Sequence, residues 1–351
     1  MKEAPSKLQL DGERVIVTTV DAIQKVETIF VGAGCSKKAA KQVAEHLADS
    51  SLCGMESHGL MRVLQYYEQF QSGYMTAAVE PRLIVHDNGI EEIDGSGGHG
   101  VPAMYLAVDH AIRVTKERGI SALAVRNVGH TGRLGAFTEM IADQGCLSIM
   151  FGGGNRKKWR QVAPYGGRKA LLPTNPYCIA IPGGELGPVV LDFATSKIAG
   201  GWVYAARSAG ARLPEGALVD PEGNPSTDPE DYFRGGAILP AGDAKGYALA
   251  LVAEIMAEAL LGPTTTEASW LMITIDCSRY REPSQMRQIA EEILSEIRDS
   301  PPAVGFDSVQ VPGERERKQR ELSNGLIGVP ERTWVQITEL ADSLSKKSAL
   351  N

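Results

Sequence analysis

The chain has 351 residues, of which 43% are hydrophobic and 23% charged, and its formal net charge is -7. This composition is ordinary for a globular enzyme. The acidic charge argues against a nucleic-acid partner, because binding to a phosphate backbone requires a basic surface. The length is enough to bury one large core or two smaller ones.

The sequence also predicts the environment of the protein. Residues 1–15 contain no apolar run of signal-peptide length, and the apolar stretch Gly246–Gly262 is interrupted by Glu254 and Glu258. We therefore expect a cytoplasmic protein that does not contact a membrane. The five cysteines include no Cys-x-x-Cys pair, so the sequence predicts neither a metal site nor a disulfide framework.

The N-terminal part is expected to be helical. Ile23, Val26 and Phe30 recur at helical spacing, and Ser36 is a suitable N-cap for a second helix. A third helical pattern covers Leu60–Phe70.

A possible anion site lies at the start of this third helix. Ser57 and His58 stand where free backbone amides favour a negative charge. Arg62 and Tyr66 are four residues apart and share a helix face. A guanidinium there could clamp a carboxylate with two hydrogen bonds. The pattern therefore indicates a site for a small carboxylic acid, although an ordinary surface helix would also explain it.

A glycine-rich turn follows the strands expected in residues 82–94. Gly95–Gly100 matches Gly-x-Gly-x-x-Gly and precedes a helix over Pro102–Arg118 and a strand over Ile120–Val125. This order is the context of a Rossmann dinucleotide site. However, Arg126 occupies the place of the acidic residue that usually binds the ribose. The residues alone leave open whether the turn binds a dinucleotide.

The strand Ile120–Val125 runs into Gly129-His130-Thr131-Gly132. Loops that leave a rigid strand often carry catalytic groups, and histidine exchanges protons near neutral pH. His130 is therefore a candidate acid–base residue. The alternative is a histidine that only caps the helix starting near Gly132.

Further candidates lie in the second half of the chain. Asp192 ends the short strand Val189–Leu191 and could contact a ribose or cap a helix. Lys245 precedes the apolar helix Ala248–Leu261 and could contact a phosphate. Residues 207–240 are expected to be mostly loops. Cys178 could be proposed as a thiol nucleophile, but no nearby residue would lower its pKa.

Taken together, six short blocks resemble the malate/L-lactate dehydrogenase type 2 family over nearly the whole chain. The family includes ureidoglycolate, sulfolactate and diketogulonate oxidoreductases and cyclic-imine reductases. The blocks are Ser57-His58-Gly59 with Arg62 and Tyr66, Gly129–Gly132, Thr174–Pro176, Asp192–Ser196, Leu239–Tyr247 and Pro312–Glu314.

The resemblance implies an α/β, non-Rossmann, three-layer fold with a mixed sheet and an N-terminal helical segment, forming a homodimer. Gly95–Gly100 would then be a tight turn near the site. The implied organisation is a helical segment over 1–80 that lines the substrate site, an NAD(P)-binding core over 81–310, and a C-terminal segment over 311–351 that returns to the N-terminal part.

The resemblance also implies the activity, a hydride transfer between NAD or NADP and a small 2-hydroxy or 2-oxo acid. His130 would be the acid–base residue and Arg62 the carboxylate clamp, with Ser57, Tyr66, Thr174 and Asn175 also lining the substrate site. The cofactor would be bound by His58, Gly154, Asp192, Phe193, Ala194, Lys245, Gly313, Glu314 and Arg315.

The chain departs from the family pattern at Pro173, at Trp202 and at Asp243-Ala244. The last two changes lie near the implied cofactor site, so NAD and NADP both stay open. Three alternatives remain: a catalytically silent NAD(P)-binding or regulatory protein, a cyclic-imine reductase, and a hydrolase that uses Cys178.

Overall fold

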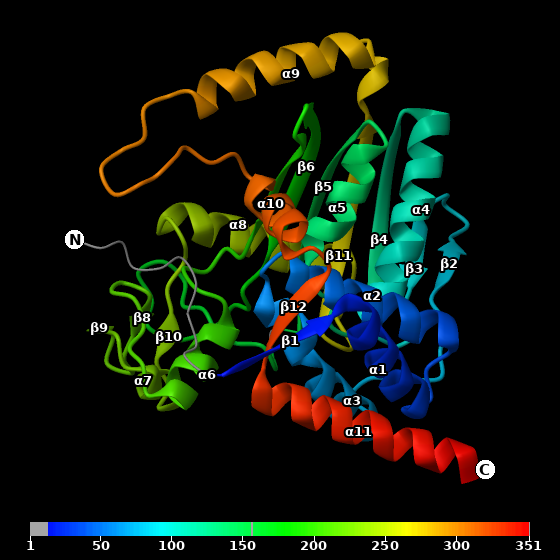
Figure 1. Cartoon of the computed structure of the whole chain (residues 1–351). Helices are drawn as coiled ribbons and strands as arrows, with labels where there is room; N and C mark the ends of the chain where they lie inside the picture. Colours follow the sequence, from blue (N-terminus) through cyan, green and yellow to red (C-terminus); the bar gives the residue numbers. More distant parts are fainter. Residues whose placement is uncertain (1–12, 156, 351) are drawn as a thin grey trace.

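The computed structural model describes residues 13–155 and 157–350 (Figure 1). At its centre lies a seven-stranded sheet with the order β2-β3-β4-β11-β5-β6-β7. Only β3 and β4 pair in parallel, and every other neighbouring pair in this sheet is antiparallel. The strands are β2 (Arg82–Val85), β3 (Glu91–Asp94), β4 (Ile120–Val128), β5 (Cys146–Gly153), β6 (Tyr177–Gly184), β7 (Gly187–Phe193) and β11 (Ala268–Asp276).

This topology confirms the expected mixed, non-Rossmann α/β fold. The strand–turn–helix–strand unit inside it is real, because β3, the glycine turn, α4 (Gly100–Arg118) and β4 follow one another and β3 and β4 are parallel. A Rossmann sheet would continue with further parallel strands. Here antiparallel β11 lies against β4 instead.

Helices cover both faces of the sheet. Because side chains alternate along a strand, the neighbouring residues Tyr177 and Cys178 of β6 point to opposite faces of the sheet. Cys178 contacts Thr138 of α5 (Leu134–Asp143), with 2.9 Å between Sγ and Oγ1. The hydroxyl of Tyr177 donates to the carbonyl of Leu249 in α8 (Ala244–Ile255) at 2.9 Å. The sheet is therefore the middle of three layers, as expected.

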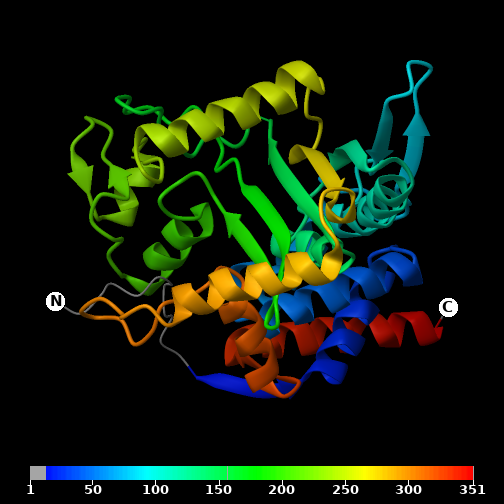
Figure 2. The same ribbon diagram turned by 90° about the horizontal axis from the view of Figure 1, so that it is seen from above.

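The first and last segments of the described chain lie side by side (Figure 2). β1 (Arg14–Thr18) pairs with β12 (Leu326–Pro330), and α1 (Thr19–Gly32) packs against α11 (Glu331–Leu350). The remaining helices of this region are α2 (Lys37–Leu52), the 3-10 turns η1 (Glu56–His58) and η2 (Leu60–Arg62), α3 (Val63–Gln71) and α10 (Glu314–Ser323). The three-part division over 1–80, 81–310 and 311–351 stays a prediction.

The region expected to be mostly loops forms a small lobe with its own core. It contains α6 (Gly200–Ala209), α7 (Pro229–Phe233) and a three-stranded sheet of β8 (Leu218–Val219), β9 (Pro225–Ser226) and β10 (Ala237–Ile238). Strands of two residues are too short to show an alternating pattern, so the sequence does not reveal them. The buried core includes Val162, Val203, Leu213, Leu218 and Ile238.

A buried ion cluster joins α2, α5 and α10. Arg133, which is 4% exposed, contacts Asp49 of α2 at 2.9 Å and Glu139 of α5 at 3.8 Å. Arg320 of α10 contacts the same two carboxylates at 2.8 and 3.2 Å. Arg133 lies three residues after His130, so the cluster anchors the loop that carries this histidine to both ends of the chain.

Replacing Arg133 by alanine should destabilise the fold. The change removes the buried cation of the cluster, while Arg320 still contacts both carboxylates, so we expect a cost of about 1–3 kcal/mol, that of leaving buried hydrogen-bonding groups without one partner. Urea unfolding measures the difference. Lys41→Ala is the matched control, because its pair with Glu45 is exposed on both sides and should contribute less than about 1 kcal/mol. Equal stability of the two variants would contradict this role of the cluster.

Candidate active site

His130 lies at the centre of a group of polar and aromatic side chains. Its Nδ1 is 2.6 Å from the hydroxyl of Tyr66 in α3 and 3.1 Å from the backbone nitrogen of Gly132. A backbone N–H can only donate, so Nδ1 must carry the lone pair in this geometry. Tyr66 then donates to the same atom. The proton of the neutral ring is therefore on Nε2.

The loop that holds His130 needs glycine at Gly132. Gly132 has φ 75°, and a Cβ there would lie 2.2 Å from Nε2 of His46. This His46 nitrogen accepts the backbone N–H of Arg133 at 2.9 Å, and its ring stacks on Phe137 with 4.9 Å between the ring centres. The histidine of α2 therefore fixes the backbone just after His130.

The Gly95–Gly100 turn packs against the same loop. The N–H of Gly129 donates to the carbonyl of Gly98 at 2.8 Å, and the N–H of Gly100 donates to the carbonyl of His130 at 3.1 Å. A Cβ on Gly100 would lie 2.6 Å from the carbonyl oxygen of Gly129. Glycine is therefore required here for the close approach of two backbones. The Rossmann interpretation of this motif is wrong, because the sheet around it is not a Rossmann sheet.

Two further histidines lie close to this pair. The ring of His58 is 5.4 Å from that of His130, and the ring of His99 meets Tyr66 edge-on at 4.4 Å. His99 belongs to the glycine turn and caps α4. The sequence did not indicate it as a site residue, because the turn around it matches a phosphate-binding motif. Burial lowers the pKa of both His58 and His99 to about 3.

Arg62 is held in place by its own segment. Its Nε donates to the carbonyl of Ser57 at 2.6 Å, and its Nη1 donates to the side chain of Gln65 at 2.7 Å. The hydroxyl of Ser57 is 2.9 Å from Nδ1 of His58. Burial, followed by the Arg62 cation, lowers the pKa of His130 well below its usual value. Thus the structure brings Ser57, His58, Arg62, Tyr66 and His130 into one site.

Thr174 and Asn175 bind internal partners, and their place in the substrate site stays a prediction. The carbonyl of Thr174 accepts the backbone N–H and the hydroxyl of Thr195, each at 2.9 Å. The side-chain nitrogen of Asn175 donates to buried Glu254 at 3.0 Å. Gly154 donates its N–H to the same carboxylate at 2.9 Å. Glu254, which the sequence did not single out, therefore connects α8 to the end of β5.

The other predicted cofactor residues lie around the end of β7 and the start of two helices. Asp192 accepts the N–H of Gly135 at 2.7 Å and so caps α5, and Phe193 and Ala194 follow it directly. Gly313 packs on this strand, where the N–H of Val190 donates to the carbonyl of Pro312 at 3.1 Å.

Charged members of this set differ in their availability. Arg298, the last residue of α9 (Pro283–Arg298), donates two hydrogen bonds to the carboxylate of Glu314, at 2.7 and 3.0 Å. Both bonds go to the same carboxylate oxygen. Arg315 pairs with Glu316. Lys245, near the start of α8, is exposed.

Cys178 is buried, and its thiol contacts the hydroxyl of Thr138 in α5. Burial is the main cause that raises the pKa of this thiol well above its usual value. A thiol that stays protonated is a poor nucleophile, which argues against the hydrolase alternative.

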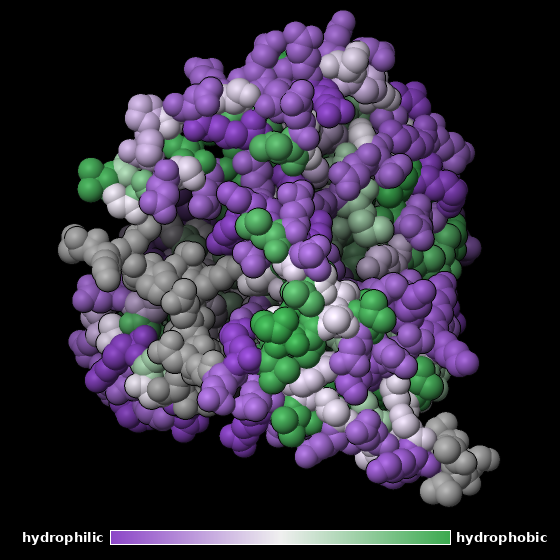
Figure 3. Space-filling model, viewed as in Figure 1, coloured by the Kyte–Doolittle hydropathy of each residue, from purple (hydrophilic) through white to green (hydrophobic). Residues whose placement is uncertain are grey.

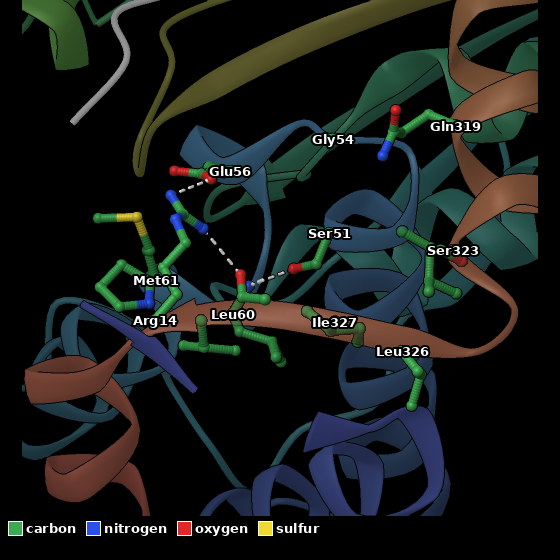
Figure 4. Close-up of a pocket in the computed structure, with 14 residues that line it drawn as sticks. Arg14, Ser51, Gly54, Glu56, Leu60, Met61, Gln319, Ser323, Leu326 and Ile327 are labelled. Carbon is green, nitrogen blue, oxygen red and sulfur yellow. Dashed lines mark hydrogen bonds and ion pairs between the residues drawn. The ribbon is translucent and has the colours of Figure 1, made fainter. Parts of the chain in front are cut away.

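A cavity of about 230 Å³ lies between β12 and the turns η1 and η2 (Figure 4). Glu56, Leu60 and Met61 line it, but Ser57, His58, Arg62 and His130 do not. Arg14 pairs with Glu56 at this cavity. The cavity is therefore distinct from the site around His130.

Within residues 13–155 and 157–350, no group of three or more His, Cys, Asp or Glu side chains is arranged to hold a metal ion. In the same part of the chain, no helix has the length and apolar character needed to cross a bilayer.

Comparisons with known proteins place the chain in a family. A family model described as malate/L-lactate dehydrogenase matches residues 17–338. An L-lactate dehydrogenase of Cupriavidus necator is 31% identical over 358 residues, which cover 97% of this chain and 98% of the relative. A Delta(1)-pyrroline-2-carboxylate/Delta(1)-piperideine-2-carboxylate reductase of Pseudomonas putida is 32% identical over 312 residues, covering 85% and 88%.

The fold agrees with this similarity. The solved structure of a sulfolactate dehydrogenase from Methanocaldococcus jannaschii superimposes with a TM-score of 0.83 and 28% identity, covering 94% of this chain and 98% of that one. The family match spans the site around His130 as well as the sheet and the N-terminal helices. The chain therefore belongs to the malate/L-lactate dehydrogenase family of oxidoreductases.

Proposed function

We propose that this protein is an NAD(P)-dependent oxidoreductase that interconverts a small 2-hydroxy acid and the corresponding 2-oxo acid. The observation that carries the proposal is the arrangement of His130, whose Nε2 bears the proton while Nδ1 is engaged by Tyr66 and Gly132. Arg62 lies near enough to affect the pKa of this histidine. A proton donor and a carboxylate clamp side by side suit a 2-oxo acid.

Arg62 is the residue that would hold the substrate. Ser57 and Gln65 use its Nε and Nη1, which fixes the plane of the guanidinium and leaves Nη2 to bind a carboxylate. A clamp that is ordered before the substrate arrives lowers the entropic cost of positioning it. The carboxylate at Arg62 would direct the C2 oxygen towards His130.

When bound, a nicotinamide would supply the hydride to C2 or accept it from C2. During reduction the C2 oxygen gains negative charge and takes the Nε2 proton of the cationic His130 ring, which becomes neutral with its remaining proton on Nδ1. During oxidation this neutral ring, whose Nε2 is then free, removes the hydroxyl proton. Burial and Arg62 keep the ring neutral before the substrate binds. A hydroxyl can both donate and accept, so Tyr66 can remain bonded to Nδ1 in the neutral ring and in the cationic ring.

The residues proposed for the cofactor have the chemistry of a dinucleotide site. Lys245 is exposed and could contact a pyrophosphate, and Asp192 keeps one carboxylate oxygen that could accept from a ribose hydroxyl. His58 adjoins His130 and would lie beside the nicotinamide. These assignments, with Gly154, Phe193, Ala194, Gly313, Glu314 and Arg315, and the choice between NAD and NADP, stay predictions. Binding of NADH and NADPH without turnover of any acid would favour the silent, regulatory alternative.

We also propose that the protein forms a homodimer. Figure 3 shows an apolar patch on the surface over β1 and β12. Ile16 of β1 is 63% exposed and Leu326 of β12 is 46% exposed, and apolar patches of this kind often mark interfaces.

His130→Ala should lower kcat by about 10²–10⁴-fold, the usual effect of removing an acid–base group. The affinities for NADH and NADPH, measured by fluorescence titration, should change little. His86→Ala is the matched control, because this imidazole directly follows β2 and is about half exposed. A His130→Ala enzyme with wild-type turnover would show that the proton comes from another group.

Arg62→Ala should act mainly through substrate binding. Loss of a charged hydrogen bond of about 1.5–3 kcal/mol corresponds to a KM raised roughly 10- to 100-fold for 2-oxo acids. Steady-state kinetics would show this increase, and Arg62→Lys should recover part of it because the charge returns without the planar fork. Arg118→Ala, an exposed site on α4, provides the control. An unchanged KM would contradict the clamp.

Light scattering should give the mass of a dimer for the wild-type protein and of a monomer for the Ile16→Asp/Leu326→Asp variant, because burying two carboxylates at an interface is costly. The matched control is Val252→Asp on the exposed side of α8. A wild-type monomer would contradict the dimer. A dimer that persists in the double variant would contradict this surface.

A further inference from the structure

Glu267 is a half-buried residue whose Oε2 atom is buried, and the mechanism above has no use for its carboxylate. It immediately precedes β11, and its N–H donates to the carbonyl of Val128 at 3.2 Å. Val128 is two residues from His130. The preceding carbonyl, of Thr266, accepts hydrogen bonds from Tyr74 and Asn155. The backbone of Glu267 is therefore fixed on both sides, beside the strand that carries the proposed proton donor.

The side chain of Glu267 belongs to the substrate side of the site. Besides burial, the charge of Arg62 influences the pKa of its carboxyl by lowering it, and the charge of Glu267 in turn raises the pKa of the Tyr66 and Tyr74 hydroxyls. Its Oε2 atom is buried and has no hydrogen-bond partner within the described residues. Leaving a buried polar atom unpaired is costly, and proteins tend to retain such groups where a ligand supplies the missing partner.

We propose that Glu267 is a specificity-determining residue, which favours monocarboxylate substrates that carry a hydrogen-bond donor and excludes dicarboxylates. The inference rests on the function proposed above. Arg62 can neutralise one carboxylate of the substrate. A second carboxylate in the same site would meet Glu267 with a like charge, whereas an N–H or O–H group would pair with its free oxygen.

A 2-imino monocarboxylate has the chemistry that suits this oxygen best. When its nitrogen is protonated, the C=N–H⁺ group can donate to Glu267 while Arg62 binds the carboxylate. Hydride adds to the carbon of C=N, and the π electron pair moves to nitrogen, which keeps its proton and becomes an amine. The negative charge of Glu267 would stabilise the cation before the hydride arrives.

The ionisation of Glu267 gives the proposal a pH dependence. Burial raises the pKa of this carboxyl to about 7, and Arg62 partly opposes the increase. Above pH 7 the carboxylate repels a second carboxylate, and below pH 7 the neutral acid does not. The tyrosines and histidines around it keep their charge in this range. Burial raises the pKa values of Tyr66 and Tyr74. It lowers those of His58, His99 and His130. The nearby cations are Arg62 and Lys158, whose ammonium group lies over the Tyr74 ring.

The test compares kcat/KM for pyruvate, oxaloacetate and a cyclic 2-imino monocarboxylate at pH 6 and pH 8.5, with the preferred nicotinamide. The wild-type enzyme should disfavour oxaloacetate relative to pyruvate about tenfold more strongly at pH 8.5 than at pH 6. At pH 8.5, Glu267→Gln should raise kcat/KM for oxaloacetate by about tenfold. The same variant should lower it for the imine by about tenfold, change it little for pyruvate, and lose the pH dependence of the ratio.

The controls separate the two proposals. Glu117→Gln removes an exposed carboxylate from α4 and should leave all ratios unchanged. If wild-type enzyme reduces the acids but its ratio of oxaloacetate to pyruvate does not vary with pH, or if Glu267→Gln leaves the ratios unchanged, the role of Glu267 is wrong and the proposed function stands. If no acid or imine is reduced with either nicotinamide, the proposed function itself fails. The wild-type pH series decides the question even if the variant does not fold.

Discussion

The site depends on the contact between Tyr66 and Nδ1 of His130, at 2.6 Å. Together with the N–H of Gly132, the hydroxyl fills the inner side of the imidazole, and the ring must present Nε2 to a ligand. The tautomer and the orientation of the His130 ring are therefore fixed by two partners. Tyr66 precedes His130 by 64 residues and lies in α3, and Gly132 lies in the loop after β4. A proton donor held in this way does not have to reorganise when the substrate binds.

This contact requires that α3 and the β4–α5 loop be held together, and several buried groups do so. His46 of α2 accepts the N–H of Arg133, and Arg133 pairs with Asp49. Arg320 reaches the same carboxylate from α10. The pairing of β1 with β12 brings the C-terminal part of the chain to this place. The ends of the sequence thus support a histidine near its middle, which explains why the site needs the whole fold.

The grouping of Arg62 and Tyr66 could be predicted from the sequence, because its signals are local. Helical periodicity places Arg62 and Tyr66 on one face of a helix, and the structure has them four residues apart in η2 and α3. The glycine motif Gly95–Gly100 suggested a Rossmann site wrongly because it, too, is a local signal. A six-residue pattern records that two backbones approach closely, but not which backbones they are. In Gly95–Gly100 the neighbour is the His130 loop, and only the direction of β11 beside β4 shows that the sheet is not of the Rossmann type.

Glu254 and Glu267 show what the sequence conceals. Both are carboxylates without a motif, and their roles depend on neighbours that are distant in sequence. Glu254 has two internal donors, from Gly154 and Asn175, on a single oxygen, so it is a structural group that connects two elements. Glu267 has no such partner on Oε2 and lies beside Arg62 and Tyr66. Glu254 also has one unpaired oxygen, Oε1, but two donors already compensate its charge. No hydrogen bond within the described residues reaches Oε2 of Glu267, which makes this oxygen the better candidate for a ligand partner.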